Sequence, residues 1–294
     1  MKIKSNSYIF HCIYFIFFPI FSNYLRAEIN LDSINETKTI INNPNSKICN
    51  VGNCNIFGGV KSGKNLFHKF NSFDTRGSIE QVKFFNGKQK NIIVGVSSKN
   101  GTFLNKPIKF ESQGNLFWVS PHGIKIEKGG NFINTKNISF TTADSLNFSK
   151  NIFSVFNNNK FHLKNYNSEP TINFNPTNQS ENLNSVKIKI SGTNIFVDKK
   201  LYLDSPNGMI DINDSIIKTT SKNNGSITIT GNSVFLRGDT FILSNGEEHG
   251  GLIQIGGSWQ NSNNKIRESN RTVVEDKVLI DTSSNSGDGG IIVI

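Results

Sequence analysis

Short apolar runs that recur at a fixed spacing constrain the fold of this chain more than any other feature. Residues 188–192 (IKISG) recur as residues 227–231 (ITITG), and residues 250–255 (GGLIQI) recur as residues 289–294 (GGIIVI), each time 39 residues later. Strand–turn units at a fixed period indicate a solenoid, and this offset predicts two coils of roughly 20 residues each.

The same β pattern extends toward the N-terminus. Between residues 55 and 148, β-branched and aromatic runs such as 79–85 and 116–119 alternate with Gly, Asn, Ser and Pro, without helical periodicity. Gly and Asn suit the corners of coils, and alternate Ile, Val, Leu and Phe suit a shared apolar interior. We expect an all-β fold, a right-handed parallel β-helix, with an extended arm at residues 28–48 and an irregular stretch at residues 150–185.

The first 27 residues have the pattern of a signal peptide. Lys2 and Lys4 precede an apolar stretch at residues 9–21, interrupted only by His11, and Ala27 offers a small residue at a cleavage point. About 13 apolar residues are too few to span a bilayer. The segment predicts export, with an uncleaved anchor as the alternative.

Charge is spread thinly over the chain. The 32 basic and 22 acidic residues give a net charge of +10, but no run of five basic residues occurs. Nucleic-acid-binding proteins gather Lys and Arg on one face among aromatic residues. Scattered lysines instead suit exposed strand faces and edges, where they oppose aggregation, so we expect no nucleic-acid partner.

Two cysteines follow the signal segment. Cys49 and Cys54 flank four residues, a spacing that suits a small disulfide-closed turn in an oxidising compartment, with free thiols as the alternative. A metal centre would need more ligands than two Cys, and no neighbouring His completes one. The sequence predicts no metal site and no cofactor.

Three short motifs could carry chemistry but have simpler explanations. Residues 58–65 (GGVKSGKN) approach a phosphate-binding loop, yet Asn65 replaces the Ser or Thr that binds magnesium. Residues 237–239 (RGD) are explained by a turn. A polysaccharide-cleaving β-helix could use acidic residues, but no pair is fixed by spacing, and we expect turns at the four candidates Asp198, Asp204, Asp211 and Asp214.

Three blocks of the sequence carry a family resemblance. The first holds Asn65, Leu66, Phe67 and His68, the second holds Asn115, Pro121 and Gly123 with Ser120 at a position where the family has Asn, and the third is residues 142–148 (TADSLNF). Together they resemble the N-terminal secretion (haemagglutination activity) domain of filamentous-haemagglutinin-like exoproteins, the passengers of two-partner secretion systems. Pro121 and Gly123 can form the tight turn of the second block.

The resemblance implies a function and a division of the chain. In that family, an outer-membrane β-barrel transporter with periplasmic receptor modules recognises the N-terminal domain, and the passenger stacks coil by coil outside. We expect the signal peptide at residues 1–27 to be followed by a secretion domain at residues 28–150 that caps the stack, and by coils at residues 151–294. The last coil stops in mid-strand pattern at Ile294 without a polar cap, which suggests truncation at the C-terminus. The residues of the first two blocks other than Ser120, seven in all, would carry transporter recognition.

We therefore expect a non-enzymatic, adhesin-like exoprotein of a Gram-negative-type bacterium, secreted or displayed via the periplasm, with a host or cell-surface receptor as a further partner. Two alternatives stay open. A β-helical polysaccharide lyase or hydrolase predicts clustered carboxylates in a lateral groove. A truncated remnant predicts no function.

Overall fold

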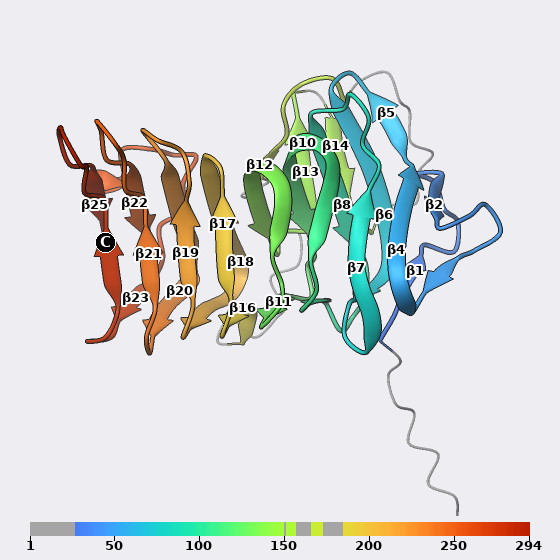
Figure 1. Cartoon of the computed structure of the whole chain (residues 1–294), viewed down its shortest axis with the longest axis horizontal. Helices are drawn as coiled ribbons and strands as arrows, with labels where there is room; N and C mark the ends of the chain where they lie inside the picture. Colours follow the sequence, from blue (N-terminus) through green and yellow to red (C-terminus); the bar gives the residue numbers. More distant parts are fainter. Residues whose placement is uncertain (1–26, 150, 157–165, 173–184) are drawn as a thin grey trace, which may run out of the picture.

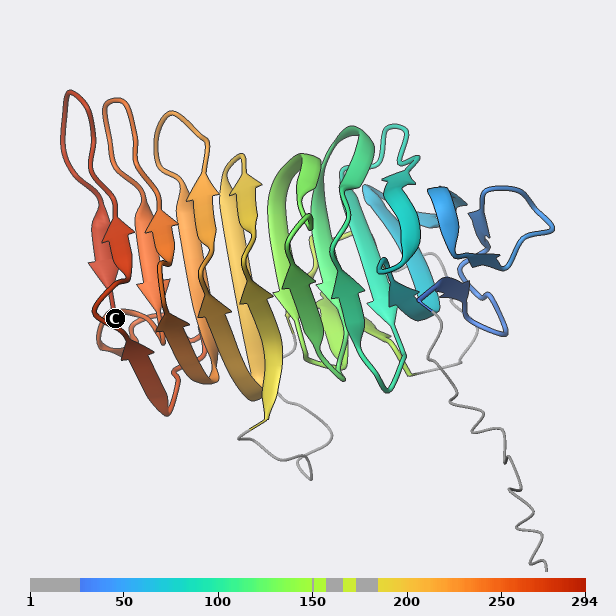
Figure 2. The same ribbon diagram turned by 60° about the horizontal axis from the view of Figure 1, so that its bottom comes forward.

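The structure is a computed structural model that describes residues 27–149, 151–156, 166–172 and 185–294. The chain is all-β, 58% strand, and about seven turns of stacked parallel strands form a β-solenoid. Figures 1 and 2 show the coils side by side along the long axis, from the blue N-terminal end to the red C-terminal end. The predicted parallel β-helix is confirmed. The expected signal segment, apart from Ala27, lies outside the described residues.

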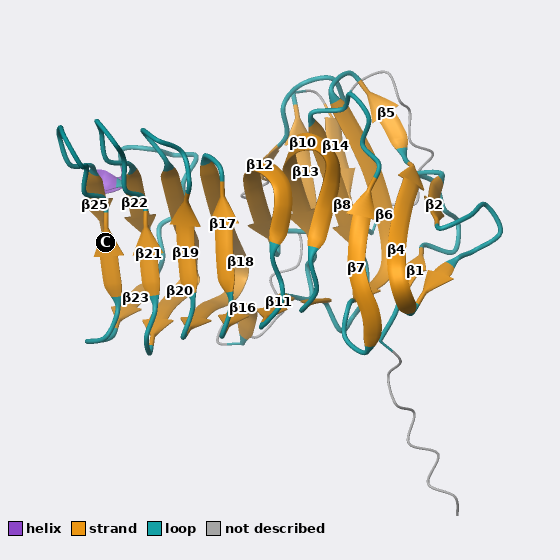
Figure 3. Cartoon of the chain, in the orientation of Figure 1, coloured by secondary structure: helices purple, strands orange, loops and turns teal. Residues whose placement is uncertain are grey.

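Most strands belong to the coils and pair in parallel with the coil before and after (Figure 3). Those of the N-terminal half are β4 (Val51–Gly58), β6 (Asn65–Asp74), β7 (Ser78–Phe84), β8 (Asn91–Val96), β9 (Thr102–Leu104), β10 (Ile108–Val119), β11 (Ile124–Glu127) and β12 (Phe132–Thr141). Those of the C-terminal half are β16 (Val186–Ser191), β17 (Asn194–Val197), β18 (Lys200–Asn213), β19 (Ile216–Thr219), β20 (Ser226–Arg237), β21 (Phe241–Leu243), β22 (Leu252–Ile255), β23 (Arg271–Val274), β24 (Leu279–Asp281) and β25 (Ile291–Val293).

Antiparallel strands close the N-terminal end of the stack. These are β1 (Ile29–Leu31), β2 (Thr39–Ile41), β3 (Ile48–Cys49) and β5 (Val60–Ser62), which pair with one another or with β4 and β6. The expectation of an extended arm at residues 28–48 is wrong, because this segment forms paired strands and buries Ile29 and Ile41 fully in the core. The buried Lys69 ammonium lies 3.7 Å from Asp32 and 3.8 Å from Glu36, which fastens this segment to β6.

The coils are stacked in register, so that equivalent residues contact each other. One inward row is at most 1% exposed and runs through Leu66, Ile92, Leu116, Ile138, Leu201, Ile227 and Ile253. Alternate residues of the same strands point outward, and their row contains Phe67, Ile93, Phe117, Ser139, Tyr202 and Thr228. Each coil thus buries apolar surface against the one before it.

The register corrects the expected coil length. Equivalent asparagines at 65, 91, 115 and 137 are 26, 24 and 22 residues apart, and Leu252 pairs directly with Ile291, so the offset of 39 residues spans one coil and not two. The other repeat has no structural counterpart, because its two copies lie at different places in the coil. Ile188 pairs with Ile210 in the second half of β18, whereas Ile227 pairs with Leu201 in the first half of the same strand. Both sequences place buried Ile at alternate positions, a local pattern that strands at different places in a coil share.

Two insertions lengthen individual coils. The first separates Thr141 from its register partner Asp204 by 63 residues, and its described residues include a three-stranded antiparallel sheet of β13 (Ser145–Phe148), β14 (Asn151–Ser154) and β15 (Thr171–Ile172). The second is the loop at residues 256–270, which contains the short 3₁₀ helix η2 (Trp259–Asn261). The described part of residues 150–185 is therefore more regular than expected, since it supplies two strands of a separate sheet.

Candidate functional site

The first family block lies in the interior of the folded protein. Asn65, Leu66, Phe67 and His68 belong to β6, and each is at most 1% exposed. Leu66 and His68 are in the inward rows, whereas Phe67 points outward and is covered by the added sheet. These four of the seven residues expected to carry transporter recognition are thus inaccessible from outside in this folded state.

Asn65 and Asn115 belong to one ladder of amide hydrogen bonds. The Asn91 amide donates to Asn65 Oδ1 at 2.7 Å, Asn115 donates to Asn91 at 2.8 Å, and Asn137 donates to Asn115 at 2.9 Å. The Asn65 amide in turn donates to the backbone oxygens of Tyr166 and Ser168. Asn91 and Asn137 could not be inferred from the sequence, because a ladder becomes visible only once the register of the strands is known.

His68 is a buried neutral side chain and has no open route to a ligand. Its Nδ1 lies 3.0 Å from the Thr39 hydroxyl, and its Nε2 has no hydrogen-bond partner among the described residues. The ring packs edge-on to Phe84, 5.4 Å between centroids. Burial lowers the pKa of His68 to about 3, so the imidazole is neutral at physiological pH.

The second block forms the predicted tight turn. The Gly123 amide donates to the Ser120 carbonyl at 3.0 Å, and both Pro121 and Gly123 are buried. Gly123 has φ +123°, and a Cβ there would lie 2.9 Å from the Lys187 backbone oxygen of the next coil, which excludes larger residues.

Ser120 takes part in this turn through its side chain. Its hydroxyl donates to the Gly123 carbonyl at 2.8 Å and accepts from the Thr102 hydroxyl at 3.1 Å, while Trp118 Nε1 donates to Thr102 Oγ1 at 3.1 Å. In the sequence, Ser120 stood out only as a departure from the pattern of the family that the chain resembles. Its hydrogen-bonding role depends on Thr102 of the preceding coil.

The third block covers the first. Residues 142–148 lead into β13, and Ala143, Leu146 and Phe148 form a second apolar core with Phe67 on the outer face of the solenoid. The Phe67 and Phe148 rings are 5.4 Å apart between centroids. The structure therefore brings all three blocks into one unit near the closed end, with the Ser120–Gly123 turn at the far end of β10.

Cys49 and Cys54 form a disulfide, and both are buried in the closed end of the stack. The bond links β3 to β4 next to the first coil. Among the described residues, no group of three His, Cys, Asp or Glu side chains is placed to hold a metal ion.

The glycine-rich and RGD motifs are turns, as predicted. Gly63 and Lys64 connect the antiparallel strands β5 and β6 in a two-residue hairpin. In the RGD sequence, Gly238 has φ +59° at a bend, and the Arg237 guanidinium donates to the buried Asp211 carboxylate at 2.6 and 2.8 Å. Arg237 is therefore engaged within the fold.

The four candidate acids do not share one environment. Asp198 and Asp214 lie at bends as expected, but the turn prediction is wrong for Asp204 and Asp211, which are buried in β18. Asp204 accepts from Arg267 Nε at 3.1 Å. A lateral groove of about 510 Å³ does exist on the solenoid, and Glu169 is the single carboxylate among its described lining residues.

Comparison of the chain with protein-family models and with curated proteins gave no match. In the part of the chain that the structure describes, no helix has the length and apolar character needed to cross a membrane.

Proposed function

We propose that this chain is the exported passenger of a two-partner secretion system. A periplasmic receptor module of an outer-membrane transporter recognises residues 28–150, and the chain is displayed or released as a non-enzymatic, adhesin-like β-helix. The proposal rests mainly on one observation: the three blocks that carry the family resemblance lie next to one another at the closed end of the solenoid. Phe67 packs on Phe148, and Asn65 is joined to Asn115 through the ladder.

The burial of the motif residues indicates when recognition happens. Asn65, Leu66, Phe67 and His68 are interior in the folded protein, so the transporter meets them on a chain that has not yet folded. An unfolded segment can add as a strand to the edge of a receptor sheet. Outside the cell, the antiparallel end provides a template, and each later coil gains apolar contacts with the previous one.

A matched pair of variants separates recognition from folding. Leu66→Ala and Leu236→Ala each truncate a fully buried leucine, but only Leu66 lies in a family block. The chain is co-expressed with its cognate transporter, and the medium, cell surface and periplasm are assayed. We expect transporter-dependent export of the wild type and of Leu236→Ala, and periplasmic retention of Leu66→Ala.

Other outcomes contradict the proposal in different ways. Equal loss of export in both variants would mean that folding energy and not the motif decides secretion. Retention of the wild type with an intact transporter would favour the truncated-remnant alternative.

A further inference from the structure

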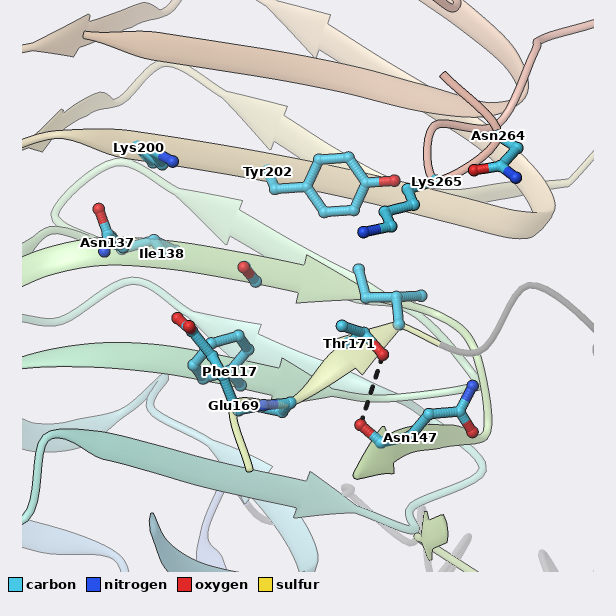
Figure 4. Close-up of a pocket in the computed structure, with 13 residues that line it drawn as sticks. Phe117, Asn137, Ile138, Asn147, Glu169, Thr171, Lys200, Tyr202, Asn264 and Lys265 are labelled. Carbon is cyan, nitrogen blue, oxygen red and sulfur yellow. Dashed lines mark hydrogen bonds between the residues drawn. The ribbon is translucent and has the colours of Figure 1, made fainter. Parts of the chain in front are cut away.

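The two insertions of the solenoid fold onto the same outer face and leave a groove between them. One wall comes from the first insertion and contains Asn147, Glu169 and Thr171, and the other comes from the 256–270 loop and contains Asn264 and Lys265 (Figure 4). In repeat proteins, insertions on one face often build the binding face. The groove floor is the outward surface of β10, β12 and β18.

The floor has the shape of a slot between two aromatic side chains. Phe117, Ser139 and Tyr202 are register partners on three successive coils, so the backbones of Phe117 and Tyr202 are about 9.5 Å apart at the usual strand spacing. Ser139 lies between them and is too small to fill the gap. Aromatic side chains on either side of a small polar residue accommodate a ring-shaped ligand with an apolar face and a polar rim.

Two polar atoms in the lining lack partners. The Asn137 amide oxygen is buried without a hydrogen bond, because the next residue in the ladder position is Lys200 and not another Asn. The Tyr202 hydroxyl is also buried, and among the described residues it makes no hydrogen bond of good geometry, although the Thr230 side chain lies close enough to act on its pKa. Burial, followed by the nearby charge of Asp204, raises the pKa of Tyr202, so this hydroxyl stays a proton donor. Buried polar atoms without partners are rare and costly. Both atoms belong to side chains that line the groove, and a small rotation of either side chain toward the groove would let it bond a ligand hydroxyl.

Lysines border the groove at both sides. Lys200 and Lys265 line it together with the single carboxylate Glu169. The floor is a sheet face whose backbone groups are already paired between coils, so an extended peptide would find no strand edge there. Recognition must come from side chains: amides, hydroxyls, ammonium groups and aromatic faces.

We propose that this groove binds an oligosaccharide, with a sugar ring in the slot over Ser139 between Phe117 and Tyr202. Asn137 and Tyr202 bond its hydroxyl groups, and Lys200 and Lys265 favour sugars that carry a carboxylate. The inference does not depend on the secretion proposal, because a folded chain from any export route would contain the same groove.

The test uses the folded full-length mature chain on a printed array of neutral, uronic-acid-containing and sialylated oligosaccharides, with the best probe then titrated by calorimetry. Ser139→Phe fills the slot. Because it only adds a third aromatic residue to the outward row between Phe117 and Tyr202, the variant should fold, and it should no longer bind the sugar. Tyr202→Phe should weaken binding about fivefold, the usual effect of one lost hydrogen bond. Lys265→Ala should weaken acidic probes more than neutral ones. Phe196→Ala is the control, since this exposed aromatic residue lies on β17 outside the groove.

Several results would overturn the proposal. They are the absence of binding to any oligosaccharide on the array, unchanged affinity in a folded Ser139→Phe variant, an equal loss in Phe196→Ala, or capture of peptides from a peptide array in place of sugars. Circular dichroism and the melting temperature of each variant establish that it is folded.

Discussion

Replacement of Asn91 by Ala tests the asparagine ladder most sharply. Its side chain donates to Asn65 at 2.7 Å and accepts from Asn115 at 2.8 Å. Removal takes a partner from the fully buried Asn65 oxygen, which costs about 1–3 kcal/mol, and from the half-buried Asn115 amide, which costs about 1 kcal/mol because water can replace it. We expect a loss of about 2–4 kcal/mol in the free energy of unfolding.

Asn137→Ala is the matched control. Asn137 ends the ladder, makes one bond within it, and already has an unpartnered oxygen, so its removal should cost about 1 kcal/mol or less. Urea unfolding followed by the fluorescence of the buried Trp118 gives both midpoints. If Asn137→Ala is as destabilising as Asn91→Ala, the hydrogen bonds of the ladder do not stabilise the fold as argued.

Three further predictions concern stability. Reduction of the Cys49–Cys54 bond, or its replacement by two alanines, should lower stability by about 2 kcal/mol, the loop-closure value for so short a loop; an unchanged melting temperature with and without reductant would contradict this. The pKa of His68 is about 3 in the folded protein and about 6.5 in the unfolded chain; the unfolded chain therefore binds more protons between these values, and stability should fall by about 2 kcal/mol from pH 7 to pH 5. His68→Gln should flatten that pH profile, and an identical slope in the variant would refute the assignment. Arg267→Ala should leave the buried Asp204 carboxylate without its ion pair, lower stability by about 3 kcal/mol, and make the 256–270 loop more sensitive to protease; equal digestion rates would show that the pair does not anchor the loop.

The sequence was sufficient to predict the fold class but not the spacing of its coils. Alternating Ile and Val with Gly and Asn at corners is a local property, and it correctly indicated a β-helix. Coil length depends on which strands pair. The similarity of residues 188–192 and 227–231 misled because strands at different places in a coil can carry Ile at the same alternate positions. The strands of residues 28–48 were missed because Ile29 and Ile41 lie in short apolar pieces of a mostly polar segment, so their burial becomes evident only from long-range pairing.

The candidate site was predictable only in part. The Ser120–Gly123 turn follows from local sequence, whereas the contact between Phe67 and Phe148 joins residues far apart in the chain. The groove could not be predicted at all. Phe117, Ser139 and Tyr202 come from three coils and pair side by side. Because the first insertion separates Thr141 from its partner Asp204 by 63 residues, and likewise Ser139 from Tyr202, the sequence spacing does not reveal that these residues share a row.

A binding measurement with the purified periplasmic modules of the transporter tests the central claim most directly. The full-length mature chain is presented to these modules once in its folded state and once freshly diluted from urea. Because Asn65, Leu66, Phe67 and His68 are interior in the folded protein, the account predicts binding of the unfolded chain, loss of that binding as the chain folds, and weak binding of unfolded Leu66→Ala. Equal binding of the folded and unfolded chain, or no binding of either, would contradict it.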